Sequence, residues 1–251
     1  MDLQKARAST HLPLAADLSV AVLLLTLAVL AAGALFQLSS GFYPLAALLG
    51  ISTLACISAR WPGNRDFGWA NRVTLARGLL VITLVSMAPF LDASLPAERL
   101  WLYAGLCLIA LVLDGADGYV ARATGTETDF GARFDMELDA LFILGLCLAV
   151  SALDRAGIWV LALGLMRYVF LATGQVWPFL GGALPDSFRR KTVCVWQLVT
   201  LMVALLPVTP DALAFWSLVF ALALLCYSFG IDIRWLYRNH AQQGEDNGPL
   251  H

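Results

Sequence analysis

Four aspartates with helical spacing stand near the middle of this sequence. Asp114 and Asp117 lie three residues apart, and Asp135 and Asp139 lie four residues apart. On helices each pair would share one face, and two antiparallel helices joined by a short turn would point both pairs into one space. Carboxylates so close together repel one another unless cations neutralise them. Oxygen ligands without His or Cys suit Mg²⁺ or Mn²⁺, and a pair of such ions could bridge a pyrophosphate and activate a hydroxyl.

Small residues and an arginine accompany the four aspartates. Gly118 and Gly131 carry no side chain, so a flat base or a phosphate could approach the backbone there. The small side chain of Ala121 leaves room for the same ligand, and Arg122 could bind a phosphate through two parallel hydrogen bonds. Any one of these residues alone could equally belong to a solvated helix end. Together they predict a site for a phosphate-bearing substrate.

The elements that must position these residues are membrane helices. Of the 251 residues, 60% are hydrophobic and 14% are charged, whereas soluble domains carry roughly a quarter charged residues. The net charge of −2 provides no basic surface and excludes a nucleic-acid partner. A spanning helix needs about 20 apolar residues. The sequence predicts eight such helices, at about 18–38, 43–59, 73–91, 99–117, 135–153, 157–175, 192–208 and 212–234.

The basic residues predict how these helices are oriented. Lys and Arg gather in the N-terminal segment and in the segments that follow the second, fourth, sixth and eighth predicted helices. Because cytoplasmic loops of membrane proteins are enriched in Lys and Arg, both termini and the aspartates are expected on the cytoplasmic side. The tail beyond Tyr237 is polar and is expected to be disordered.

The aspartate stretch resembles the signature of the CDP-alcohol phosphotransferase family. The matching residues are Asp114, Asp117, Gly118, Ala121, Arg122, Gly131, Asp135 and Asp139. The resemblance implies a site for two metal ions with Asp114, Asp117 and Asp135 as ligands. It implies that Asp139 is a metal-proximal general base that deprotonates the acceptor hydroxyl. The two glycines, Ala121 and Arg122 would line the pocket for cytidine and pyrophosphate, and members of the family look like homodimers.

A second stretch, from Asn71 to Arg77, resembles the first core helix of the same family, where Asn, Thr and Arg face the nucleotide. Thr74 and Arg77 are one helical turn apart, so both can face one pocket. Thr74 could instead bond its own helix backbone. The resemblance thus adds Asn71, Thr74 and Arg77 to the nucleotide-binding residues.

Basic residues nearer the C-terminus are candidates for binding the acceptor. Arg167 lies inside a predicted apolar helix, and Arg189, Arg190 and Lys191 open the next one. Adjacent cations at a membrane boundary ordinarily contact lipid headgroups. Family members that use phosphorylated acceptors carry Gly-Lys-x-Lys-Thr here, and this chain matches it only in part, with Phe188 and Arg189 in the first two places. The cluster favours an anionic acceptor, while inositol, serine, choline and ethanolamine stay open.

The resemblance implies a phospholipid-synthesising transferase that moves a phosphatidyl group from CDP-diacylglycerol to an acceptor hydroxyl, such as that of a phosphorylated polyol, and releases CMP. The expected fold is an all-α polytopic membrane helix bundle, with a six-helix catalytic core and two extra N-terminal transmembrane helices. The expected segments are a cytoplasmic N-terminal segment (1–17), the extra helix pair with its linker (18–70), the catalytic membrane domain (71–235) and a polar cytoplasmic tail (236–251). The expected location is the bacterial inner membrane, with the active site facing the cytoplasm and membrane lipids as further partners.

Two other classes of membrane protein could carry aspartates between helices. A prenyltransferase of the UbiA type also binds Mg²⁺ through Asp-rich motifs, but it would lack the glycine and Ala-Arg pattern and would hold its motifs far apart in sequence. A divalent-cation transporter would place its acidic residues nearer the middle of the membrane. The sequence therefore favours the transferase and leaves the transporter as the alternative from a different class.

Overall fold

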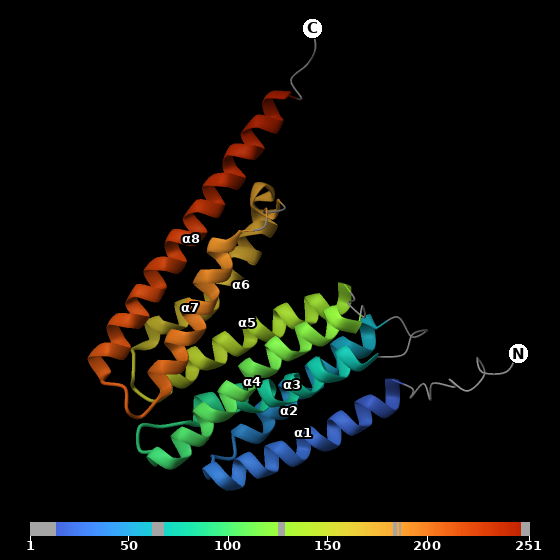
Figure 1. Cartoon of the computed structure of the whole chain (residues 1–251), viewed down its shortest axis with the longest axis vertical. Coiled ribbons are helices and arrows are strands. Elements are labelled where there is room, and N and C mark those ends of the chain that lie inside the picture. Colours follow the sequence, from blue (N-terminus) through green and yellow to red (C-terminus); the bar gives the residue numbers. More distant parts are fainter. Residues whose placement is uncertain (1–13, 62–67, 125–128, 183–184, 186, 247–251) are drawn as a thin grey trace, which may run out of the picture. The chain divides into compact units, whose positions relative to one another are not determined.

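The computed structural model of this chain describes residues 14–61, 68–124, 129–182, 185 and 187–246; within these ranges the side chains of 68–70, 116–124, 129, 178 and 241–246 are left undescribed. Eight α-helices follow one another through the described residues (Figure 1). They are α1 (Leu14–Phe36), α2 (Phe42–Arg60), α3 (Gly68–Met87), α4 (Ala97–Thr124), α5 (Asp129–Ala152), α6 (Leu161–Val176), α7 (Phe188–Leu205) and α8 (Asp211–Asp246). Three short 3₁₀ turns join them, η1 (Ala88–Phe90), η2 (Ile158–Val160) and η3 (Pro178–Gly181). This confirms the all-α fold, and a helix lies at each of the eight predicted positions.

The helices have the length and composition of a membrane protein. Within the described residues, five stretches are long and apolar enough to cross a bilayer, namely 14–36, 42–60, 71–90, 158–176 and 211–240. The remaining helices α4, α5 and α7 carry, at one end, the charged residues singled out above. The chain is therefore an integral membrane protein whose charged helix ends are candidates for chemistry.

The chain forms two compact units, and the first comprises residues 1–87 and 106–138. In this unit α1 and α2 both pack against α3. The apolar window of α3 is 72% buried, against 22% for the windows of α1 and α2. Thus α3 is an interior helix, and α1 and α2 turn much of their apolar surface outward, as helices in contact with lipid do.

The buried surface of α3 has two faces with different partners. Leu75, Leu79 and Ile82 recur at helical spacing and pack in one cluster with Ala21 and Leu25 of α1 and with Ile57 and Trp61 at the end of α2. On the other side of the helix, Arg77 points at α4 and α5. This division places one face of α3 on the two N-terminal helices and the other face on the aspartates.

The second unit comprises residues 88–105 and 139–251. Here α7 lies along α8, and α6 contacts both α8 and η3. Gly164 allows α6 to approach α5 closely, because a Cβ atom at this position would lie 2.8 Å from the Cα atom of Leu144. Arg155 follows α5 and bonds Asp211 at the start of α8 with a distance of 2.6 Å.

The prediction of a disordered tail beyond Tyr237 is wrong for the residues that the structure describes. The last helix, α8, continues to Asp246 and is 36 residues long. The added turns are polar, but they include the helix formers Ala241, Gln242, Gln243 and Glu245. A helix that is already nucleated within the membrane can extend into a polar sequence because each added residue closes one more backbone hydrogen bond.

Candidate metal centre and acceptor cavity

Arg77 bridges two of the four aspartates. It is 2% exposed on α3, and one terminal nitrogen of its guanidinium bonds Asp114 near the C-terminal end of α4. Its other terminal nitrogen, Nη2, donates to Oδ1 of Asp135 at 2.6 Å, near the start of α5. Both carboxylates are about one third exposed, at 34% and 39%. The arrangement brings the first and third aspartates of the motif together, as their spacing predicts.

Asp139 lies one turn beyond Asp135 on the same continuous helix. Asp114 and Asp135 are close enough to share a metal ion, because a carboxylate oxygen of one lies within 4.8 Å of a carboxylate oxygen of the other. The donor set consists of carboxylate oxygens alone, which is the chemistry that Mg²⁺ and Mn²⁺ prefer. The residues therefore fit a divalent metal ion.

Other residues of the motif are only partly described. Asp117, Gly118, Ala121 and Arg122 continue the helical backbone of α4, but their side chains lie outside the described residues. Gly131 is in the first turn of α5 and is partly exposed. Their roles as a metal ligand and as nucleotide-pocket residues stay predictions.

Three residues assigned to the nucleotide by resemblance lie on α3. Asn71, Thr74 and Arg77 are all buried, with 8%, 9% and 2% of their surface exposed. Arg77 reaches two of the aspartates directly. The contact of these residues with a nucleotide stays a prediction.

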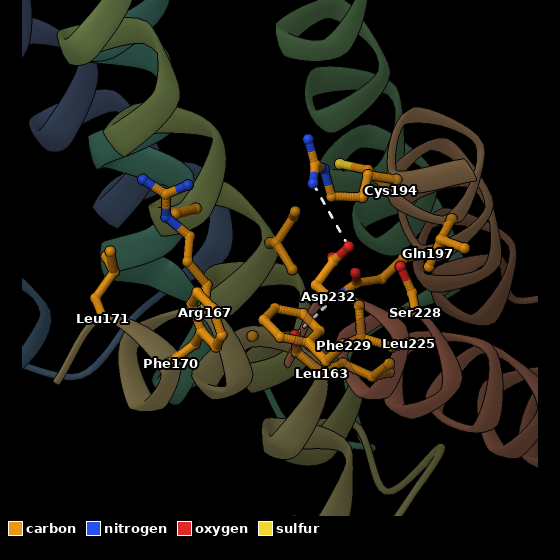
Figure 2. A pocket seen from close by; sticks show the side chains of 15 residues that line it. Leu163, Arg167, Phe170, Leu171, Cys194, Gln197, Leu225, Ser228, Phe229 and Asp232 are labelled. Atoms are coloured by element: carbon orange, nitrogen blue, oxygen red, sulfur yellow. Dashed lines mark hydrogen bonds and ion pairs between the residues drawn. The ribbon is translucent and has the colours of Figure 1, made fainter. Parts of the chain in front are cut away.

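A cavity of about 360 Å³ lies within the second unit, among α5, α6, α7 and α8. Figure 2 shows Arg167 from α6 and Asp232 and Ser228 from α8 among the side chains around it. Arg190 from α7 also lines it, and much of the rest of the wall is apolar. Cavities of this size, mostly apolar with a few converging polar groups, are typical of small-molecule sites.

The arginines at the start of α7 are tied to α8. Arg189 bonds the side chain of Asp232 and both the hydroxyl and the backbone carbonyl of Ser228. Arg190 lies 3.5 Å from the same carboxylate oxygen of Asp232. The carboxylate is therefore shared by two guanidinium groups, and its charge offsets only part of theirs. Lys191 is exposed and is not among the residues that line the cavity.

The cavity also adjoins Asp139. Ala140, the next residue of α5, lines it, as does Cys194 of α7. Asp139 and Arg167 both lie close enough to Cys194 for their charges to act on it. Asp139 thus lies near two residues that line this cavity, Ala140 and Cys194.

The family model described as CDP-alcohol phosphatidyltransferase matches residues 67–227, which is more than half of the chain. The chain belongs to this family. A curated relative, the CDP-diacylglycerol–glycerol-3-phosphate 3-phosphatidyltransferase of Bacillus subtilis (strain 168), is 31% identical over 129 residues, covering 44% of this chain and 65% of the relative. The match thus spans less than two thirds of the length of that relative. No solved structure matches the chain significantly.

Membership of the CDP-alcohol phosphatidyltransferase family confirms the resemblance drawn from the aspartate motif. It sets aside the prenyltransferase and the transporter as classes for this chain. The matched region begins at residue 67, so α1 and α2 lie outside it.

Two polar residues of the cavity were not singled out in the sequence. Asp232 is 7% exposed, and Gln197 is 4% exposed and donates from Nε2 to the backbone carbonyl of Leu163 at 2.8 Å. Asp232 could have been found, because an ionisable residue inside an apolar spanning segment is usually functional. Gln197 gives no comparable signal, since a neutral amide in a membrane helix often serves only to join helices.

Proposed function

We propose that this chain transfers a phosphatidyl group from CDP-diacylglycerol to a hydroxyl of a phosphorylated polyol and releases CMP. The observation that carries the proposal is the cavity beside Asp139, which is lined by Arg167 and Arg190. Two guanidinium groups in a largely apolar wall suit a phosphate, which they can bind through charge-assisted hydrogen bonds. The relative from Bacillus subtilis is named for glycerol 3-phosphate, which makes that compound the first candidate acceptor.

The metal site would consist of the four aspartates of the motif, Asp114, Asp117, Asp135 and Asp139, which would hold two Mg²⁺ or Mn²⁺ ions. When bound, the cations would neutralise the carboxylates and the donor pyrophosphate and stabilise the charge that develops on the leaving phosphate. Arg77 would contribute to the same neutralisation from α3, because its guanidinium already spans two of the carboxylates.

Asp139 would act as the general base. Its carboxylate would accept the proton of the acceptor hydroxyl while Arg167 and Arg190 hold the acceptor phosphate in the cavity. The acceptor oxygen would then attack the phosphorus that carries the diacylglycerol. A new bond forms between that phosphorus and the acceptor oxygen, the bond from that phosphorus to the bridging oxygen breaks, and CMP leaves with the bridging oxygen. Positioning and charge neutralisation supply most of the rate acceleration in such transfers.

The donor would lie with its headgroup at the charged helix ends. Asn71, Thr74, Arg77, Gly118, Ala121, Arg122 and Gly131 would line the pocket for cytidine and pyrophosphate. The apolar outer surfaces of the helices would accommodate the acyl chains. The distribution of Lys and Arg supports a site that faces the cytoplasm, with both termini on that side of a bacterial inner membrane. The active form would be a homodimer.

The same chemistry with a neutral or zwitterionic acceptor is the alternative, and one experiment separates the two. The purified full chain is given CDP-diacylglycerol with Mg²⁺ or Mn²⁺, and CMP release is measured with glycerol 3-phosphate and inositol phosphate beside glycerol, inositol, serine, choline and ethanolamine. We expect a phosphorylated acceptor to stimulate release at least tenfold more than its neutral counterpart, the equivalent of about 1.4 kcal/mol. Equal or better stimulation by the neutral compounds would contradict the proposed acceptor class.

A further inference from the structure

The two helices that precede the family-matched region pack directly on the helix that carries Arg77. We propose that α1 and α2 position α3 at the metal centre, and that the ion pair between Asp17 and Arg72 is the contact that sets this position. The inference rests on the metal site of the proposed function. It gives the N-terminal helix pair a role in the site, although neither helix contributes a predicted ligand.

The pair between Asp17 and Arg72 joins α1 to the first turns of α3. Nε of Arg72 donates to Oδ1 of Asp17 at 2.9 Å, and Nη2 donates to Oδ2 at 3.0 Å. The side chains are 20% and 11% exposed, so water screens the pair only in part. Two parallel bonds fix the relative orientation of both groups, which a single contact between flexible side chains does not do. The pair therefore restrains both the rotation and the axial shift of α3 against α1.

The apolar contacts of α3 continue from the same face. Arg72, Leu75, Leu79 and Ile82 follow one another at intervals of three and four residues, which places them in one row along the helix. The last three belong to the cluster formed with α1 and α2. The ion pair thus lies at one end of an interlocking apolar surface, where it selects one register among those that the apolar contacts alone would allow.

The opposite face of α3 carries Arg77. Arg72 and Arg77 are five residues apart, a rise of about 7.5 Å along one rigid helix. Because Arg77 bonds both Asp114 and Asp135, a small rotation or shift of α3 would move the guanidinium away from between the carboxylates. The two carboxylates would then repel each other and separate. A cation would bind more weakly, because it would have to draw them together again.

The end of α2 supplies a second connection to the same centre. Trp61 packs edge-on against Phe130 of α5 with ring centroids 5.6 Å apart, and Phe130 stacks on Phe134 at 6.0 Å. Phe134 is the residue before Asp135 and packs against the cluster of α1, α2 and α3. The N-terminal helices therefore contact the helix of Arg77 and also the first turns of α5 that carry Asp135.

The test measures Mn²⁺ binding to the purified full chain by electron paramagnetic resonance, well below the unfolding temperature. We expect Asp17→Asn to weaken Mn²⁺ binding about 3- to 10-fold, the size of coupling carried through packed elements. The exchanged pair, Asp17→Arg with Arg72→Asp, should recover most of this loss, because it restores the ion pair. Arg155→Gln is the matched control, since it breaks an ion pair between other segments and should leave Mn²⁺ affinity unchanged.

The outcomes separate this inference from the metal site on which it rests. If wild-type protein binds no Mn²⁺, the metal site itself is contradicted. If wild-type protein binds Mn²⁺ and Asp17→Asn binds it equally well, the positioning role is contradicted, even where the variant unfolds at a lower temperature. A loss in Asp17→Asn that the exchanged pair does not recover would also contradict it, because the effect would then not come from the ion pair.

Discussion

Nη2 of Arg77 lies 2.6 Å from Oδ1 of Asp135, and the neighbouring nitrogen of the same guanidinium bonds Asp114. One buried side chain thus joins α3 to the end of α4 and the start of α5. Both bonds are accepted by an Oδ1 atom, so the planar guanidinium of Arg77 holds the two carboxylates in fixed positions relative to α3. In the proposed metal site, Arg77 would therefore position the two carboxylates.

The first prediction concerns Arg77→Lys. Lysine keeps the positive charge but cannot bridge two carboxylates as the planar guanidinium does. The substitution therefore removes the bridge between Asp114 and Asp135 while the electrostatic repulsion between residue 77 and a bound cation stays the same. We expect Mn²⁺ binding, measured by paramagnetic resonance, to weaken about 10-fold, the lower end for changes to groups that orient metal ligands. Arg133→Lys, at an exposed position on α5, should bind Mn²⁺ as wild-type protein does. Unchanged affinity in Arg77→Lys would show that Arg77 does not orient the ligands.

The second prediction concerns Arg167→Gln. Removing one guanidinium from the cavity should raise the KM for glycerol 3-phosphate about 10- to 100-fold, the equivalent of one or two charge-assisted hydrogen bonds. The value of kcat should change little, because the phosphate is bound equally before and during the transfer. Arg234→Gln, at an exposed position on α8, is the control for the loss of a positive charge. A normal KM in Arg167→Gln would remove this residue from the acceptor site.

The third prediction compares two aspartates that each pair with an arginine. Asp232 is buried and binds Arg189, whereas the side chain of Asp211 is 82% exposed and binds Arg155. Asp232→Asn should lower the free energy of unfolding in detergent by about 1.5–3 kcal/mol, because the partly buried guanidinium of Arg189 loses a buried, charged acceptor. Asp211→Asn should cost less than about 1 kcal/mol, as exposed pairs usually do. Equal losses would mean that burial does not govern these pairs.

The fourth prediction concerns Gly164 and the packing of α6 on α5. A Cβ atom at Gly164 would lie 2.8 Å from the backbone of Leu144, which cannot move aside as a side-chain tip can. Gly164→Ala should therefore reduce the free energy of unfolding by about 1–3 kcal/mol. A Cβ atom at Gly230 of α8 meets nothing within 4 Å, so Gly230→Ala should stabilise the protein by up to about 1 kcal/mol. Stabilisation by both changes would contradict the close approach.

The positions of the helices could be predicted well from the sequence alone. A segment that spans a bilayer must form all its backbone hydrogen bonds within one helix, so it is recognised by its length and hydropathy. It also predicted that Asp114 and Asp135 meet, since their spacing fits two neighbouring helices. It did not predict that Arg77 would join them, because which face of α3 points at the aspartates depends on packing against α1 and α2. Asp232 was missed although an ionisable residue inside an apolar spanning segment is itself a signal of function, whereas its pairing with Arg189 and Arg190 depends on how α7 packs on α8.

The proposed transfer is tested most sharply by product formation from CDP-diacylglycerol and glycerol 3-phosphate, measured for the purified full chain and for the variants Asp139→Asn and Glu137→Gln. Mass spectrometry would follow the new phospholipid and CMP together. We expect both products in equal amounts, and we expect their formation to depend on Mg²⁺ or Mn²⁺. Asp139→Asn should reduce the rate about 10²- to 10⁴-fold. Glu137→Gln, which changes an exposed carboxylate on the same helix, should change the rate less than about twofold. Transfer at the wild-type rate in Asp139→Asn, or no transfer to any acceptor by folded protein that binds the metal, would contradict the account.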